Sequence, residues 1–142
     1  FPQQVQKQYD IFKGQGHHDV FHLDVHSMPS VGTDQHRDPG EHRAEIVISD
    51  CHGKSSNSKF VDIVIAAYVK AGFRVGYNWP YFGGRVSEQY GQPAKGQHAV
   101  QAELNRSLYM DEVTKKIRPE LASAVQVRLA KALDYIVEKF DS

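Results

Sequence analysis

One segment, residues 19–30, constrains the fold of this chain more than any other. Its residues alternate between apolar and polar, in the order Phe21, His22, Leu23, Asp24, Val25 and His26. A period of two is typical of a β-strand, and Ser27 and Pro29 then end the pattern. Open α/β sheets place their chemistry at the C-terminal ends of strands. His26 is therefore a candidate metal ligand, base or hydrogen-bonding residue.

The rest of the chain alternates between predicted strands and predicted helices. Short apolar runs predict strands at residues 45–50, 73–78 and 99–105, and helical spacing predicts helices at 1–13, between 56 and 72, and from 119 onward. Ser55 or Ser56 is expected to cap the middle helix. Polar loops are expected at 31–45 and 79–96. The strand–helix–strand order over 45–78 predicts a right-handed βαβ unit, and the whole pattern predicts a single-domain α/β sandwich with a mixed, mostly parallel sheet.

The composition argues against several classes of protein. The chain has 142 residues, and its 17 Lys and Arg balance its 17 Asp and Glu. Proteins that bind nucleic acids or membrane surfaces usually carry a basic excess, so we expect neither partner. Cys51 is the single cysteine, which excludes an intramolecular disulfide and fits a reducing, cytoplasmic compartment. The chain contains no apolar run of about 18 residues, so we expect no transmembrane helix. It begins with Phe1, without a signal-like segment, and we expect a processed chain or part of a longer one.

Glu103 is the second candidate for a chemical role. The pattern of residues 99–105 places it inside a strand. A buried carboxylate without a partner is costly, so Glu103 must be paired, metal-bound or solvated. Two interpretations remain open at this point. The carboxylate forms a salt bridge with the nearby Arg106, or it acts as a general base toward a metal-bound water.

The loop that follows Asn78 is a candidate substrate-binding segment. The paired Gly83 and Gly84 would let the backbone approach a ligand, and Tyr81 and Arg85 have side chains suited to a carboxylate or a carbonyl. Arg106 is a further candidate for a substrate carboxylate. The alternatives are a tight turn for the loop and a structural ion pair for Arg106.

Other catalytic motifs are weak or missing. Cys51 precedes His52, but adjacency in a turn does not make a nucleophile and its base. The chain has no Walker loop, no dinucleotide-binding glycine motif and no paired-cysteine zinc motif.

Three segments together resemble the N-formylglutamate amidohydrolase (deformylase) family. The family patterns are Asp-x-His-Ser, Asn-x-Pro-Tyr-x-Gly-Gly and a longer distinctive block, which this chain matches at residues 24–27, 78–84 and 90–112. The resemblance implies a zinc-dependent hydrolase with the fold of zinc carboxypeptidases (phosphorylase/hydrolase-like). Such an enzyme removes the formyl group from a small acidic N-formyl amino acid, typically N-formylglutamate in histidine breakdown. The same resemblance implies that His26 is the last protein ligand of the zinc and that Glu103 is the catalytic carboxylate.

The chain also departs from this family. The family has an upstream half with a His and an acidic ligand, whereas this chain resembles the C-terminal half. A catalytic zinc needs about three protein ligands, so we expect this segment to be inactive by itself. The histidines at 17, 18, 36, 42 and 52 match no ligand motif of the family, and residues 34–45 lack its usual pattern. A related zinc peptidase or cell-wall amidase, and a non-catalytic ligand-binding domain, remain as alternatives.

Overall fold

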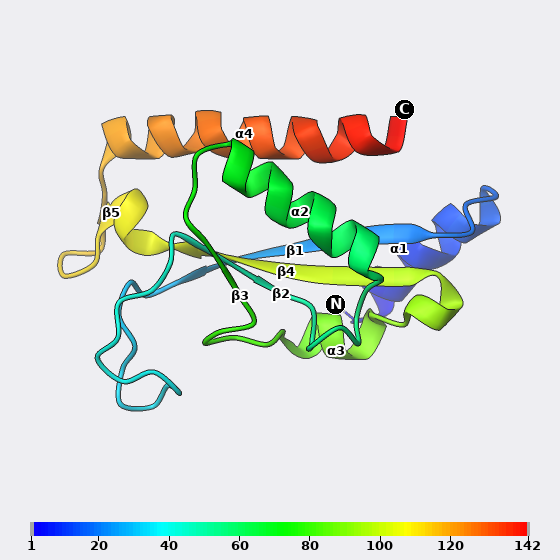
Figure 1. Ribbon diagram of the computed structural model, residues 1–142, viewed down its shortest axis with the longest axis horizontal. Coiled ribbons are helices and arrows are strands. Elements are labelled where there is room, and N and C mark those ends of the chain that lie inside the picture. Colours follow the sequence, from blue (N-terminus) through cyan, green and yellow to red (C-terminus); the bar gives the residue numbers. More distant parts are fainter. Residues whose placement is uncertain (1, 142) are drawn as a thin grey trace.

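A four-stranded sheet with helices packed against it forms the centre of the molecule (Figure 1). The computed structural model describes residues 2–141. Its strands are β1 (Val20–Met28), β2 (Ile46–Ser49), β3 (Val75–Tyr77), β4 (Gln97–Asn105), β5 (Met110–Asp111) and β6 (Lys116–Ile117). Its α-helices are α1 (Pro2–Gly14), α2 (Ser58–Lys70), α3 (Arg85–Tyr90) and α4 (Pro119–Asp141), and short 3-10 helices cover Pro93–Lys95 and Arg106–Leu108.

The strand order β1-β4-β2-β3 confirms the predicted mixed, mostly parallel sheet. β1 pairs with β4 in parallel, β2 pairs with β3 in parallel, and β4 and β2 are antiparallel. Helix α2 connects the parallel strands β2 and β3, as expected for a βαβ unit. β4 is an inner strand, which explains why its residues are almost all buried on both faces.

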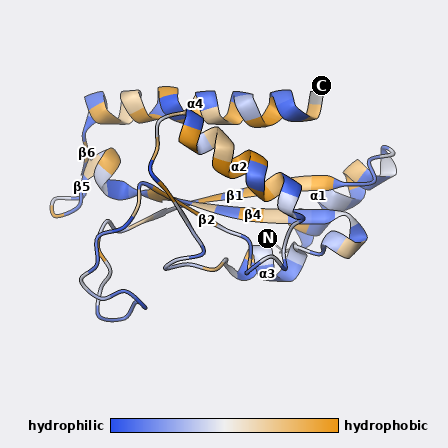
Figure 2. Ribbon diagram, in the orientation of Figure 1, coloured by the Kyte–Doolittle hydropathy of each residue, from blue (hydrophilic) through white to orange (hydrophobic). Residues whose placement is uncertain are grey.

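The hydrophobic core lies between the sheet and helices α2 and α4. Ile46 and Ile48 of β2 and Val100 and Ala102 of β4 pack there against apolar residues of both helices. Figure 2 shows α2 as largely hydrophobic and the loop before β2 as mostly hydrophilic. Because side chains alternate across a strand, the polar residues of β1 and β4 point to the opposite face of the sheet. That face carries the candidate site.

The cap of α2 differs from the prediction. Asn57, and neither Ser55 nor Ser56, precedes the helix and accepts a hydrogen bond from the backbone N–H of Phe60 (2.9 Å). The hydroxyl of Ser55 instead donates to the carbonyl of Ala99 on β4 (2.6 Å). The serine was unavailable as a cap because a tertiary contact uses its side chain.

The segment predicted as one polar loop at 79–96 contains the short helix α3 and a 3-10 turn. The hydroxyl of Ser87 accepts a hydrogen bond from the backbone N–H of Gly84 (2.9 Å) and stabilises the start of α3. Six residues are too few to show a helical period in the sequence. The loop predicted at 31–45 contains no helix or regular strand, as expected.

The last helix is confirmed, but only part of its predicted apolar stripe is buried. Val125, Ala132 and Ile136 are buried against the core, whereas Leu133 and Val137 are 47% and 57% exposed. The helix packs on α2 along one side, so apolar residues beyond that narrow contact face solvent. None of the helices in residues 2–141 combines the length and apolarity that a membrane span would require.

Candidate active site

The register of two strands brings His26 and Glu103 together. β1 and β4 are parallel, and His26 lies directly opposite Glu103 although 77 positions separate them in the sequence. Asp24 and Gln101 are opposite each other two residues earlier, on the same face of the sheet. The two residues that the sequence singled out therefore form one site at the end of β1.

The carboxyl group of Glu103 is buried and only partly satisfied. The side-chain amide of Gln101 donates to its Oε1 (3.2 Å), while Oε2 has no hydrogen-bond partner among residues 2–141. Burial raises the pKa of Glu103 from its ordinary value of 4.5 to about 7, and the electrostatic effects of His26 and Arg106 partly oppose this rise. A carboxyl group with a pKa near neutrality is suited to accept and return a proton.

Arg106 does not form the salt bridge that sequence reasoning left open. Its guanidinium donates to the hydroxyl and the carbonyl of Ser27 on β1, at 3.2 and 3.4 Å. No ion pair joins it to Glu103 in the part of the chain that the structure describes, although its charge acts on that carboxyl group. Arg106 is half-buried beside the site, and these two bonds leave further N–H donors of its guanidinium free.

His26 is exposed to solvent at the edge of the same site. Its Nε2 donates to Oδ2 of Asp24 at 2.8 Å, from the same face of β1. The carboxylate orients the ring and leaves Nδ1 as the nitrogen with a free lone pair. Metal-binding histidines commonly have such a carboxylate partner.

The glycine pair approaches protein groups closely. A Cβ on Gly84 would lie 2.6 Å from Oε1 of Gln101, the residue that donates to Glu103. A Cβ on Gly83, whose φ is 146°, would lie 2.6 Å from Sγ of Cys51. The loop therefore rests directly on the partner of the buried carboxyl group. Arg85 follows as the exposed first residue of α3, and its side chain makes no hydrogen bond or ion pair with the described residues.

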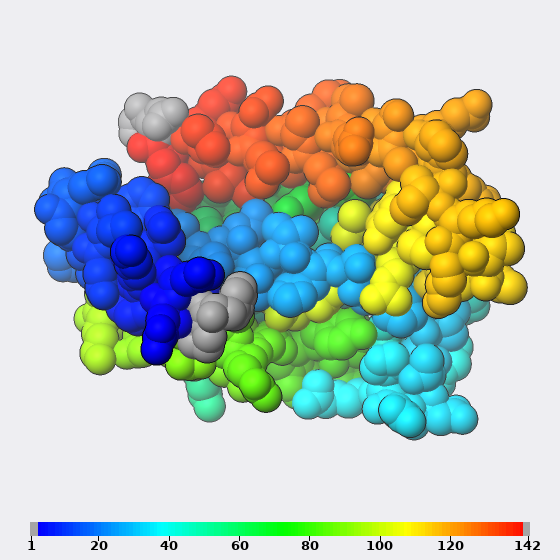
Figure 3. Space-filling view, turned by 180° about the vertical axis from the view of Figure 1, so that it is seen from behind, coloured from blue at the N-terminus to red at the C-terminus, as the bar shows by residue number. Residues whose placement is uncertain are grey.

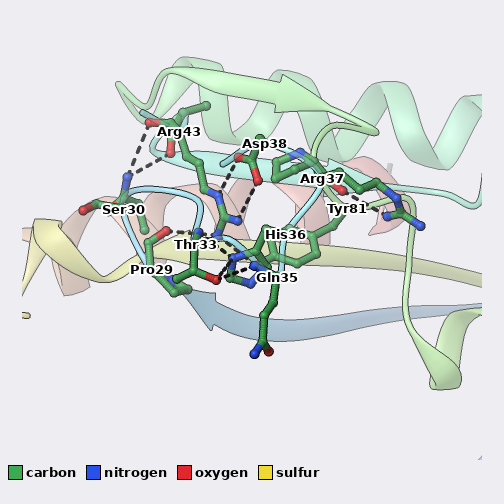
Figure 4. Close-up of polar contacts among 12 residues, drawn as sticks. Pro29, Ser30, Thr33, Gln35, His36, Arg37, Asp38, Arg43 and Tyr81 are labelled. Atoms are coloured by element: carbon green, nitrogen blue, oxygen red, sulfur yellow. Dashed lines mark hydrogen bonds and ion pairs between the residues drawn. The ribbon is translucent and has the colours of Figure 1, made fainter. Parts of the chain in front are cut away.

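A buried ion pair holds Tyr81 in place, and the sequence analysis missed it. The side chains of Arg43 and Asp38 are 1% and 2% exposed and form a bidentate pair at 2.9 and 3.0 Å. Arg43 also donates to the hydroxyl of Tyr81 (2.8 Å) and the carbonyl of Pro29 (3.2 Å), as Figure 4 shows. The hydrogen bonds from Arg43 hold the pKa of Asp38 below its usual range, and those to Asp38 raise the pKa of Arg43.

This geometry determines what Tyr81 can do. Because its hydroxyl oxygen accepts from Arg43, its proton remains available to a ligand. Asp38 and Arg43 lie five positions apart in a loop without periodicity. The only available signal was the presence of charged residues in an unusually long loop.

The described residues include one candidate metal ligand. Residues 2–141 contain no group of three His, Cys, Asp or Glu side chains that could hold a metal ion. His26, with Asp24 behind it, fits the role of one ligand. A catalytic zinc needs about three protein ligands, which is more than this set supplies. The zinc expected from the sequence therefore stays a prediction.

His36, His52 and Cys51 each make a local contact. His36 accepts a hydrogen bond from the backbone of Thr33, and the ring of His52 packs against Phe82 with 4.2 Å between centroids. The thiol of Cys51 contacts the hydroxyl of Ser87 at 3.6 Å. His52 is therefore not arranged as a base for Cys51.

Comparisons with known proteins identify the family to which this chain belongs. The sequence model of the family described as "N-formylglutamate amidohydrolase" matches residues 1–110. An N-formylglutamate deformylase of Pseudomonas putida is 41% identical over 61 residues, which are 42% of this chain and 23% of that protein.

Two solved structures share the fold. An N-formylglutamate amidohydrolase from Ralstonia eutropha JMP134 superposes with a TM-score of 0.73 at 28% identity, over 87% of this chain and 46% of that one. A gene product of Agrobacterium tumefaciens gives a TM-score of 0.61 at 22% identity, over 96% of this chain and 50% of that one. The chain thus spans about half the length of these two structures. Because the family match covers well over half of its residues, the chain belongs to the N-formylglutamate amidohydrolase family.

Proposed function

We propose that this chain contributes the catalytic carboxyl group of a zinc-dependent amidohydrolase that removes the formyl group from an N-formyl amino acid such as N-formylglutamate. The observation that carries the proposal is Glu103, whose carboxyl group is buried, half unsatisfied and opposite His26. The match to the family, and the names of the relatives from Pseudomonas putida and Ralstonia eutropha, support the substrate class. We also propose that the fold is that of the zinc carboxypeptidases.

In the proposed reaction Glu103 transfers a proton from the attacking water to the leaving amine. As the carboxylate, it takes a proton from the water that attacks the formyl carbon. As the acid, it returns that proton to the amine nitrogen when the C–N bond breaks, so the products are formate and the free amino acid. A pKa of about 7 suits both steps, because neither protonation state is costly at neutral pH. Zinc, when bound, supplies the positive charge that acidifies the water and polarises the formyl oxygen.

The remaining candidates bind and orient the substrate. His26 would be one zinc ligand through Nδ1, with Asp24 holding its other nitrogen. The free hydroxyl proton of Tyr81 can be donated to the developing oxyanion. Arg106, which donates to Ser27 beside His26, would bind a carboxylate next to the scissile bond. Arg85 is the weaker candidate, because no hydrogen bond or ion pair with residues 2–141 orients its side chain.

A non-catalytic ligand-binding domain is the second candidate. The observation that favours it is the absence of a three-ligand metal cluster in residues 2–141. Such a domain would keep the pocket and bind an acidic N-formyl amino acid without hydrolysing it. No observation favours a peptidase or cell-wall amidase.

The test measures formate release from N-formylglutamate, together with zinc content, in the protein at its full natural length. Glu103→Gln keeps the shape of the side chain but cannot take up a proton. It should lower kcat by about 10²–10⁴-fold, the usual scale for lost acid–base catalysis. The matched control is Glu138→Gln, which changes an exposed carboxyl group on α4. A folded, zinc-loaded Glu103→Gln protein with normal turnover would refute the role of Glu103, and binding without zinc or turnover would support the second candidate.

A further inference from the structure

A polar cavity opens beside Tyr81, at the junction of two loops. Its volume is about 260 Å³. The residues that line it come from the loop before β2 and from the loop after β3, and they are Gln35, His36, Arg37, Arg43, Pro80 and Tyr81. Figure 3 shows these two segments, in cyan and in green, side by side next to the surface of β1.

The cavity has an unneutralised positive charge. Arg43 is fully engaged, because it binds both carboxylate oxygens of Asp38 as well as Tyr81. Arg37 forms no ion pair with any residue in 2–141. His36 accepts a hydrogen bond at Nδ1 from Thr33, so the N–H of its neutral ring is at Nε2 and can donate to a ligand. Arg37 is therefore the free cation of this cavity.

Arg37 is exposed and lacks an acidic partner, but two contacts orient its guanidinium. Its guanidinium lies 4.1 Å from the centre of the Phe82 ring, and its NH1 donates to the carbonyl of Pro80 at 3.2 Å. Figure 4 shows Arg37 extending toward the loop of Tyr81, whereas Arg43 points to Asp38. These contacts use one N–H and one face of the group and leave its other N–H donors free. A guanidinium ordered in advance loses less entropy when it binds a carboxylate.

The cavity adjoins the proposed reaction centre. Arg43 and Tyr81 line it, and both are attached to the strands that carry the site: the side-chain amide of Asn105, two residues after Glu103 on β4, donates to the carbonyl of Arg43 (3.4 Å), and Ser49, which pairs with Gln101, donates to the carbonyl of Tyr81 (2.7 Å). Arg106 lies nearer to Glu103 along the chain, three residues after it, and donates to Ser27, the residue that follows His26. In an N-formyl amino acid the α-carboxylate is one carbon away from the scissile nitrogen, whereas an acidic side chain extends several bonds further. The two carboxylates of an N-formylated acidic amino acid would thus meet different arginines.

We infer that Arg37 binds the side-chain carboxylate of an acidic N-formyl amino acid in this cavity, and so determines the preference for an acidic over an amide side chain. The inference rests on the proposed function and adds a residue that sequence reasoning did not identify. The ion pair between Asp38 and Arg43 supports this role, because it orders the loop that carries Arg37.

The kinetic test compares N-formyl-L-glutamate with N-formyl-L-glutamine, which keeps the α-carboxylate but has a neutral side chain. In the protein at its full natural length, Arg37→Gln should reduce the kcat/KM preference for the glutamate substrate by about 10–100-fold, the scale of a charge-assisted hydrogen bond. Arg37→Lys should retain part of the preference, because it keeps the charge without the bidentate fork. Arg118→Gln is the matched control, since Arg118 is an exposed arginine paired with Asp111, and its preference should equal that of wild type.

A binding measurement separates this inference from the proposed function. In NMR titrations of the ¹⁵N-labelled 142-residue chain, N-formyl-L-glutamate should shift the Nε–Hε signal of Arg37 at lower concentration than N-formyl-L-glutamine does. Absence of turnover on both substrates would refute the proposed function, whereas this titration still tests Arg37. The inference would be overturned if wild type and a folded Arg37→Gln variant had the same kcat/KM preference for the glutamate substrate. It would also be overturned if both compounds shifted the Arg37 signal at the same concentration.

Discussion

The burial of the Glu103 carboxyl group predicts how the free energy of unfolding depends on pH. The prediction can be tested without substrate or metal. Its pKa is 4.5 ordinarily and about 7 in the folded protein, because burial disfavours the charged form. The folded state therefore binds more protons than the unfolded state between these values. The stabilising contribution is complete below about pH 4.5 and is lost as the pH rises through about 7.

The Glu103→Gln variant does not lose stability in this way as the pH rises, because the amide does not ionise. The residue is only 8% exposed, so solvent screening is small. The difference between the two pKa values corresponds to about 3 kcal/mol, as an order of magnitude. The free energy of unfolding of Glu103→Gln relative to wild type should thus rise by about 3 kcal/mol between pH 4 and pH 8.

The assay is urea unfolding followed by circular dichroism across this pH range, with a chelator present so that no metal charge acts on the carboxyl group. Glu138→Gln is the control for removing a carboxyl group from an exposed position. A difference between Glu103→Gln and wild type that stays constant from pH 4 to pH 8 would show that Glu103 ionises normally. The argument for a base poised near neutrality would then fail.

Two further predictions concern the metal and the buried ion pair. His26→Ala in the protein at its full natural length should sharply lower zinc content by elemental analysis, and unchanged zinc stoichiometry would contradict the assignment of His26 as a ligand. Arg43→Met should lower the free energy of unfolding by about 3–5 kcal/mol, because Asp38 would remain buried without its partner. The double variant Arg43→Met/Asp38→Asn should recover part of that loss in urea unfolding, and no recovery would mean that the ion pair is not what Arg43 stabilises.

Much of the secondary structure could be predicted because it is encoded locally. The alternation in β1 and the helical spacing of α2 and α4 are periodic, and each period places apolar residues on one side of its own element. The family motifs were equally local, since each is a short run of consecutive residues. These signals were sufficient for the mixed α/β sheet and for selecting His26 and Glu103.

Features that depend on contacts between distant segments could not be predicted. The cap of α2 moved to Asn57 because β4 engages Ser55, and α3 was too short to have a detectable period. The exposure of Leu133 and Val137 depends on how much of α4 another element covers, which no pattern within α4 records.

The amino-acid sequence by itself determined which residues are candidates for a chemical role and which strands carry them, because side-chain type and alternation are local properties. Only the tertiary structure decided that His26 lies opposite Glu103, that Arg106 bonds to Ser27, and that Arg37 is left as a free cation. The physical reason is that a pKa or an ion pair depends on the solvent and the charges around a group. Those surroundings exist only after the sheet has paired its strands and the two loops have packed on it.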